Sequence, residues 1–262
     1  MRYSTLRLGL FLLAGLLFAA IASFAADGVK PKDATMSILP APKTVTINGD
    51  LQEWDLSGKI GPVTFDEEVS ELYHATFYAM YDKDNFYVAA VVYEQHPPYN
   101  TYPYSGRYEW CGDEVNIRMS TRPGAPTTWP RAIAEKATSP ELWNGKFWWN
   151  HKKNVTKWQG YRGMDLCGKI YTENDLPGYQ AAAKLDADGH GYTMEIKMPW
   201  AFLNADAPRP KPGDVIALMY EIIIGSDNKI EPVRMFQIFG NCPGNGTAAF
   251  IDYNVWGTAI FK

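Results

Sequence analysis

The sequence predicts an all-β protein, an antiparallel β-sandwich built as one domain. Many short segments are rich in apolar residues and are bounded by Gly, Pro, Asp or Asn, among them "GYQAAAKL", "GYTMEIKMPW", "GDVIALMYEIIIG", "VRMFQIFG" and "VWGTAIF". Between them the chain lacks long segments with the apolar period of an amphipathic helix, and "PWAFLNAD" alone indicates a brief helical turn. Closely spaced strands without connecting helices are typical of a sandwich.

The first 25 residues are predicted to be a secretory signal peptide. Arg2 and Arg7 lie at the start of an apolar run that ends at Phe24, and the small residues Ser23 and Ala25 suit a cleavage site after Ala25. The run is short for a membrane-spanning helix, and no cysteine follows it closely to carry a lipid. We therefore expect an exported protein, secreted or periplasmic, that has no membrane contact after cleavage.

Residues 26–43 are expected to form a linker, because this stretch is rich in Pro, Ala and Lys and has no sustained period. The folded domain is expected to span residues 44–262. Its first strand is predicted in "TVTINGDLQEW", followed by a turn at Asn48-Gly49. The three tryptophans Trp54, Trp200 and Trp256 are expected in the core, since large aromatic side chains dominate sandwich interiors.

The clearest hairpin joins strands predicted at 75–81 and 86–93. Its turn, "DKDN" at 82–85, contains Asp and Asn, which form hydrogen bonds with the backbone nearby and favour tight turns. A further strand is predicted at 113–119. A long Pro-rich and Trp-rich loop from 121 to 144 then precedes "GKFWWNHKK", and loops of this length are usually functional or loosely ordered.

Composition excludes some classes of partner. The net charge is −4 and the basic residues are dispersed among carboxylates, so a nucleic-acid partner is not expected. The four histidines lack zinc-type spacing, so no dedicated transition-metal site is expected. Export permits one disulfide among Cys111, Cys167 and Cys242 and leaves one thiol over, but the spacing does not choose the pair.

Five phrases occur in an order that carries a family resemblance. They are "TINGDLQEWD", "YDKDNFYVAAVV", "WCGDEVNIRM", "GYTMEIKMPW" and "GDVIALMYEI", and they span about Thr44 to Phe261. Together they resemble the family 9 carbohydrate-binding modules and the wider DOMON-like superfamily. The resemblance implies a jelly-roll or immunoglobulin-like sandwich that binds a sugar without catalysis, and family members that hold structural calcium make such a site here conceivable. We expect a monomer.

Alternation along two strands predicts one shared polar surface. Val115, Ile117 and Met119 are expected to face the core, as are Phe147 and Trp149 on the next strand. Sugars present apolar C–H faces and a rim of hydroxyls, so they need aromatic platforms beside directional polar groups. The side chains expected to point away from the core, with the indole that precedes the first strand, form the candidate carbohydrate-binding set: Trp110, Asn116, Arg118, Trp148 and Asn150.

The resemblance implies that Trp110 forms one wall of a sugar slot and that Asn116 and Asn150 bond the hydroxyls. The chain also departs from the family pattern. Asn116 stands where family members can carry a carboxylate, and Trp148 stands where they can carry an arginine. The stretch "FGNCPGNGTAAFIDYN" lacks the second tryptophan that closes the sugar slot in the family. The identity of the glycan therefore stays open, and corner packing remains the alternative role for Trp110.

Two other functions are weighed. A b-type haem domain of the DOMON-like type would use Met235 with Met119 or Met194, although methionine in alternating strands is usually core filler. An enzyme is not expected, because the neighbouring carboxylates Asp113 and Glu114 project to opposite faces of a strand and so cannot flank one glycosidic bond. An accessory role beside a separately encoded glycan-processing enzyme is compatible with non-catalytic binding.

Overall fold

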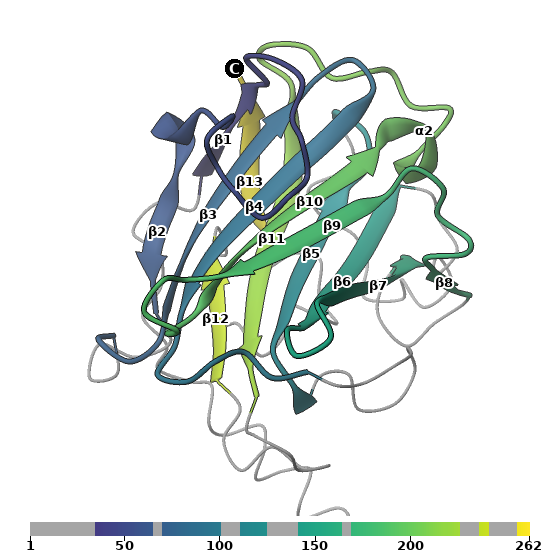
Figure 1. The fold of residues 1–262 in the computed structure, drawn as a ribbon. Coiled ribbons are helices and arrows are strands. Elements are labelled where there is room, and N and C mark those ends of the chain that lie inside the picture. Colours follow the sequence, from purple (N-terminus) through teal and green to yellow (C-terminus); the bar gives the residue numbers. More distant parts are fainter. Residues whose placement is uncertain are drawn as a thin grey trace, which may run out of the picture.

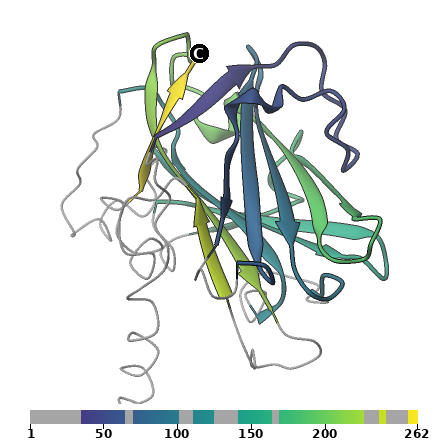
Figure 2. The ribbon, with the colours of Figure 1, turned by 90° about the vertical axis from the view of Figure 1, so that its left-hand side faces the viewer.

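Strands make up most of the chain in the computed structural model, which describes residues 35–64, 70–100, 111–124, 141–163, 169–225, 236–240 and 256–262. The strands form one continuous sheet that curls until its two halves face each other across a core (Figures 1 and 2). This arrangement confirms the predicted all-β sandwich. No helix within these ranges is long and apolar enough to cross a membrane.

The two halves are called the first and second layers. The first layer has the order β8 (Ile170–Thr172), β7 (Val155–Arg162), β6 (Leu142–Asn150), β5 (Glu114–Ser120), β11 (Val215–Ile224) and β13 (Gly257–Phe261), with β12 (Phe236–Gly240) also paired to β11. The second layer has the order β3 (His74–Tyr81), β4 (Asn85–Tyr93), β10 (Tyr192–Pro199) and β9 (Gln180–Leu185), with β2 (Ile60–Val63) paired to β3.

Strand β1 (Thr35–Pro40) connects the layers. Thr35 to Ile38 pair in parallel with β13, and Leu39 and Pro40 pair in parallel with β3. Met36 and Ile38 are buried in the core, which explains why this short stretch forms a strand. The expected linker over 26–43 is therefore wrong from Thr35 onward, and the sheet is mixed rather than purely antiparallel.

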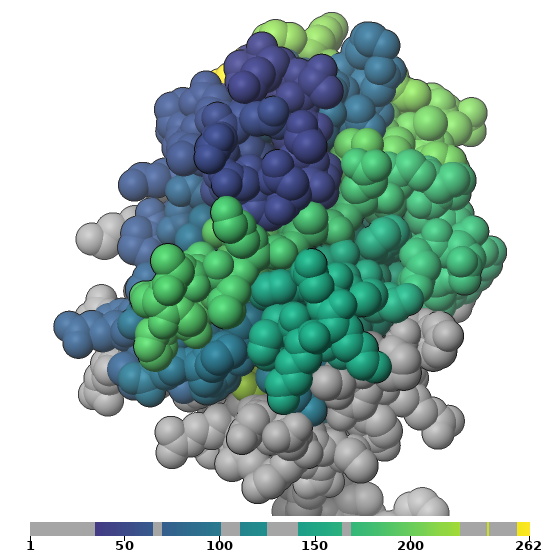
Figure 3. Space-filling view, viewed as in Figure 1, coloured from purple at the N-terminus to yellow at the C-terminus, as the bar shows by residue number. Residues whose placement is uncertain are grey.

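The segment 41–54 is not a strand, contrary to the prediction for "TVTINGD". It lies as a loop over the outside of the second layer (purple in Figure 3). The buried Glu195 carboxylate accepts hydrogen bonds from the Asn48 and Gly49 N–H groups at 2.8 and 2.6 Å and from the Trp54 indole at 2.6 Å. The "TINGDLQEW" phrase is thus held by one carboxylate on β10, and Trp54 is buried as predicted.

The main core lies between the layers, where the inward-facing side chains of both meet. The residues expected there on β5 and β6 are all in it: Val115, Ile117, Met119, Phe147 and Trp149. Trp200 and Trp256 are also buried, at 2% and 5% exposure. Burying one large apolar side chain contributes about 1.5–3 kcal/mol, so this core is the main source of stability.

The predicted hairpin is confirmed as β3 and β4. Asp82 closes its turn by accepting hydrogen bonds from the Asp84 and Asn85 N–H groups at 2.8 and 2.7 Å. The brief helical turn is also confirmed, as α2 (Trp200–Leu203), and a 3-10 turn, η1 (Leu56–Gly58), follows the capping residue Asp55. Strands β2, β7 and β8 were not predicted from the sequence.

Candidate functional site: the outer face of the first layer

A row of polar side chains crosses the outer face of the first layer. Asn116 on β5 pairs with Glu221 on β11 and with Lys146 on β6, and Lys146 pairs in turn with Gln159 on β7. Directly opposed residues of antiparallel strands share a face, so four neighbouring strands present these groups together. Pairing thus converts positions far apart in the sequence into one surface.

A buried ion pair organises this row. The Arg118 guanidinium lies 2.6 Å from Glu221 Oε2, and the Asn116 amide donates to the same oxygen at 2.8 Å. Arg118 is 3% exposed and Glu221 is 2% exposed. Charges this deep are tolerated because each has an opposite partner, and removing one partner would leave the other uncompensated. Glu221 therefore fixes the orientation of both side chains.

Two buried asparagine side-chain oxygens on this face lack a hydrogen-bond partner among the described residues: Asn116 Oδ1 and Asn144 Oδ1. The amide of Asn144 is oriented by donating to the Gly163 carbonyl. Buried polar atoms are nearly always hydrogen-bonded in native proteins, so two oriented and unused acceptors call for a donor. A hydroxyl-bearing ligand offers donors of this kind, provided that it reaches these two side chains, which are each 1% exposed.

A pair of buried carboxyls lies at the start of β5. Asp113 accepts hydrogen bonds from the N–H groups of Tyr99 and of Gly225, the latter at 2.9 Å. Burial raises the pKa of Asp113 to about 7, and it raises the pKa of the neighbouring Glu94 well above its ordinary value, with the negative charge of Asp113 adding to that effect. Glu94 is 0% exposed. The pair therefore favours a protonated state.

Comparison with known proteins identifies the fold. No family model matches the chain, and no curated protein matches it. Two solved structures of a family 9 carbohydrate-binding module from Caldicellulosiruptor kristjanssonii are similar to the chain. The cellotriose complex matches with 13% identity over 87% of this chain and 93% of that chain, at a TM-score of 0.52. The glucose complex matches with 14% identity over 86% of this chain and 95% of that chain, at a TM-score of 0.50.

A candidate carbohydrate-binding protein from Bacteroides uniformis also matches, with 13% identity over 87% of this chain and 99% of that chain at a TM-score of 0.53. The fold is that of the family 9 carbohydrate-binding modules. The family 9-like resemblance expected from the five phrases is thereby confirmed. The wider DOMON-like assignment stays a prediction.

Within the family 9-like sandwich, the predicted site residues fall as follows. Trp110 lies outside the described residues. Asn116, Arg118 and Trp148 point away from the main core, as alternation predicts, but they are buried, with Trp148 only 1% exposed. The expectation that the Trp148 ring offers an open platform is therefore wrong. Asn150 is partly exposed, and its Oδ1 accepts the Lys153 N–H at 3.2 Å in the turn after β6.

Four members of this face were not predicted from the sequence: Glu221, Asn144, Lys146 and Gln159. A signal for Glu221 exists, since it is the one charged residue within the apolar run of β11. Asn144 lies in the loop predicted over 121–144, and Gln159 lies on β7, which was not predicted. The place of Asn144 on the face could not be inferred because β6 was expected to begin after residue 144, and that of Gln159 could not because β7 was not predicted.

Two of the three methionines considered as haem ligands are buried in the core of the family 9-like sandwich. Met119 and Met194 are 0% exposed in the core, and Met235 lies outside the described residues. Cys111 is buried, whereas Cys167 and Cys242 lie outside, so the pairing stays open. Among the residues described, no group of three or more His, Cys, Asp or Glu side chains is placed to hold a metal ion.

Proposed function

We propose that this protein is an exported, non-catalytic carbohydrate-binding protein whose ligand binds at the outer face of the first layer. One observation carries the proposal: the oriented, unused acceptors Asn116 Oδ1 and Asn144 Oδ1 on that face. Support comes from the fold, because the similar family 9 structures contain cellotriose and glucose. A likeness of 13–14% identity extends to the fold, so the ligand is a proposal.

The chemistry of the face suits a sugar. Hydroxyl groups donate to amide oxygens and accept from amides and guanidinium groups, and a buried ion pair holds such groups in fixed directions. In the proposal Trp110, just before β5, supplies the aromatic wall, Asn116 bonds a hydroxyl, and Arg118 positions Asn116 through Glu221. Trp148 packs beneath the site, and Asn150 lies at its rim.

The binding test uses the mature chain, residues 26–262, titrated calorimetrically with glucose, cellotriose, xylotriose and maltotriose. Trp110→Ala is expected to lower affinity about tenfold or more, since burying the apolar surface of an aromatic side chain is worth about 1.5–3 kcal/mol. Asn116→Ala is expected to lower it about fivefold through loss of one hydrogen bond. Gln52→Ala, an exposed amide in the segment over the second layer, is the matched control.

Two results would overturn this function. One is the absence of binding to every sugar in the panel by a chain whose circular dichroism shows a folded sandwich. The other is full affinity in the Trp110→Ala variant and in the Asn116→Ala variant. Hydrolysis of any panel sugar would contradict the non-catalytic part of the proposal.

Export, a monomeric state and a role beside separately encoded glycan-processing enzymes belong to the same proposal. They rest on the leader-like residues 1–25 and on the fold. N-terminal sequencing of protein recovered from the periplasm or the medium is expected to begin at Ala26. Recovery of the uncleaved chain from the cytoplasm would contradict export.

A further inference from the structure

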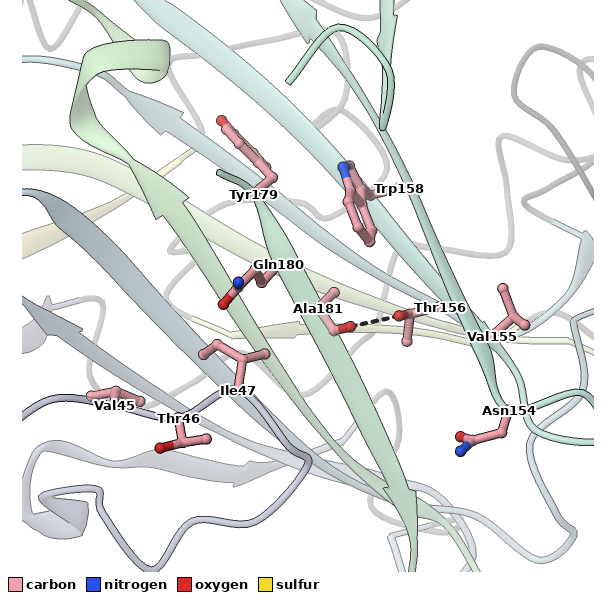
Figure 4. Close-up of a pocket in the computed structure, with 10 residues that line it drawn as sticks. All are labelled: Val45, Thr46, Ile47, Asn154, Val155, Thr156, Trp158, Tyr179, Gln180 and Ala181. Atoms are coloured by element: carbon pink, nitrogen blue, oxygen red, sulfur yellow. Dashed lines mark hydrogen bonds between the residues drawn. The ribbon is translucent and has the colours of Figure 1, made fainter. Parts of the chain in front are cut away.

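An open groove of about 730 Å³ lies at the side of the sandwich, between β7 and β9, with residues 45–47 along one wall (Figure 4). Strand β8 pairs only with residues 159–161 of β7, and β9 is the last strand in the order of the second layer. The groove therefore lies where the two layers expose their edges. The Thr156 hydroxyl bridges them here by donating to the Ala181 carbonyl at 2.5 Å.

The lining of the groove is neutral. None of the ten residues that form it is charged. The partly buried Trp158 supplies aromatic surface, and Tyr179 lines the groove but is only 5% exposed. Val155 is 40% exposed, and the carboxamides of Asn154 and Gln180 supply exposed polar groups. Mixed apolar and carboxamide surface within a volume of several hundred Å³ is typical of a small-ligand site.

The floor is held in place before any ligand arrives. Asn154 has a φ of 50°, in the left-handed region, and its Oδ1 accepts the Trp149 indole N–H at 3.2 Å. On the opposite wall, the Thr46 N–H donates to Glu53 at 2.6 Å. A rigid site loses less conformational entropy on binding, which favours affinity for a weakly bound ligand.

The absence of charge in the lining decides the class of ligand. Phosphates and carboxylates are recognised by Arg, Lys or helix N-termini, and cations need carboxylates, but the lining has neither. A neutral molecule with apolar faces and hydroxyl edges matches aromatic rings beside carboxamides. We propose that the groove between β7 and β9 is a second binding site, for a short segment of a neutral glycan chain.

This second site is separate from the first. Trp158 pairs with Phe147, which faces the main core, whereas the neighbouring Lys157 pairs with Trp148 on the outer face of the first layer. The two sites therefore lie on different sides of the same layer. The inference rests on the carbohydrate-binding function proposed above and adds to it: one module would hold a glycan chain at two places, and their combined affinity would exceed that of either alone.

The test measures the number of sites and their positions on the mature chain with cellotriose, xylotriose and maltotriose. Wild type is expected to bind two equivalents of one of these sugars, and Trp110→Ala one. Adding Gln180→Arg, which places a long charged side chain at the groove from an exposed position on β9, is expected to abolish the rest. Gln180→Ala is expected to weaken the second site about fivefold. Hydrogen exchange at 154–158 and 179–181 is expected to slow on binding.

Each result separates the two proposals. One equivalent in wild type, with affinity unchanged by Gln180→Arg, overturns the second site and leaves the carbohydrate-binding function standing. Binding that survives Trp110→Ala but is lost with Gln180→Arg supports the groove and contradicts the placement of the first site. No binding of any sugar overturns both. Tighter binding of trigalacturonate than of the neutral trisaccharides, or of a peptide along the β9 edge instead of sugars, would contradict the assigned class.

Discussion

Replacing Glu94 by glutamine should change how stability depends on pH. Glu94 is fully buried beside Asp113, 3.4 Å from the His96 imidazole, and Glu114 and Tyr192 also face this cluster. Burial, and then the charge of Asp113, raises the pKa of Glu94 well above its ordinary value of 4.5. In the unfolded chain Glu94 loses its proton above about pH 4.5, while in the folded chain it keeps it.

The sign follows from this difference. A group whose folded pKa is raised in this way stabilises the fold below its unfolded pKa, and the contribution is lost as pH rises toward its folded pKa. One such group lowers the free energy of unfolding by about 1.4 kcal/mol for each pH unit in that window. Asp113, with a folded pKa of about 7, adds a second loss between about pH 4 and 7.

Glutamine has the shape of protonated Glu94 and can donate to the Asp113 carboxylate, but it does not titrate. Between pH 5 and 7 the wild type should therefore lose more stability than Glu94→Gln does, by at most about 1.4 kcal/mol for each pH unit. Urea unfolding at pH 5, 6 and 7 measures the two slopes. Glu53→Gln is the control: Glu53 is partly exposed and the Thr46 N–H lowers its pKa, so it does not titrate in this range. Parallel curves for wild type and Glu94→Gln would refute the reasoning.

Two further predictions concern the loop over the second layer and the ion pair of the first layer. Gly49→Ala should lower the free energy of unfolding by about 2 kcal/mol in thermal unfolding, because Gly49 has a φ of +82° and an added Cβ would lie 2.9 Å from the β9 backbone. Gly189→Ala is the control: Gly189 has a φ of +77° but open space around it, so the loss should be about half as large. Equal losses in the two variants would contradict the role of the contact with β9. Arg118→Met should lower the free energy of unfolding by about 3–5 kcal/mol, because it leaves the buried Glu221 carboxylate without an opposite charge. Adding Glu221→Leu should recover much of that loss. A double variant that is no more stable than Arg118→Met would contradict the importance of the ion pair.

Much of the fold follows from local patterns. The hairpin of β3 and β4, the strand β5 and the strands β9 to β13 are predicted by alternation and by turn residues, because those signals act within a few residues. The faces of β5 and β6 are predicted for the same reason, as the core positions of Val115 and Trp149 show. The outer-face directions of Asn116 and Trp148 follow from this alternation too.

Other elements cannot be predicted from local sequence patterns. The strand β1 looks like linker sequence because its partners, β13 and β3, lie far along the chain and pair with it in parallel. The "TINGD" phrase looks like a strand, yet the Glu195 carboxylate, almost 150 residues away, holds it as a loop. The groove has no signal at all, since residues 45–47, 154–158 and 179–181 meet only after the layers close.

By itself, the amino-acid sequence determined the all-β class, most of the strands and the alternation that separates core from outer face, because each depends on neighbours within a strand or a turn. Tertiary structure alone decided that Arg118, Asn116 and Glu221 form one buried cluster, that Glu94 meets Asp113, and that two sheet edges enclose a neutral groove. These depend on distances between remote segments, and those distances exist only once the sheet has curled and its halves have packed against each other.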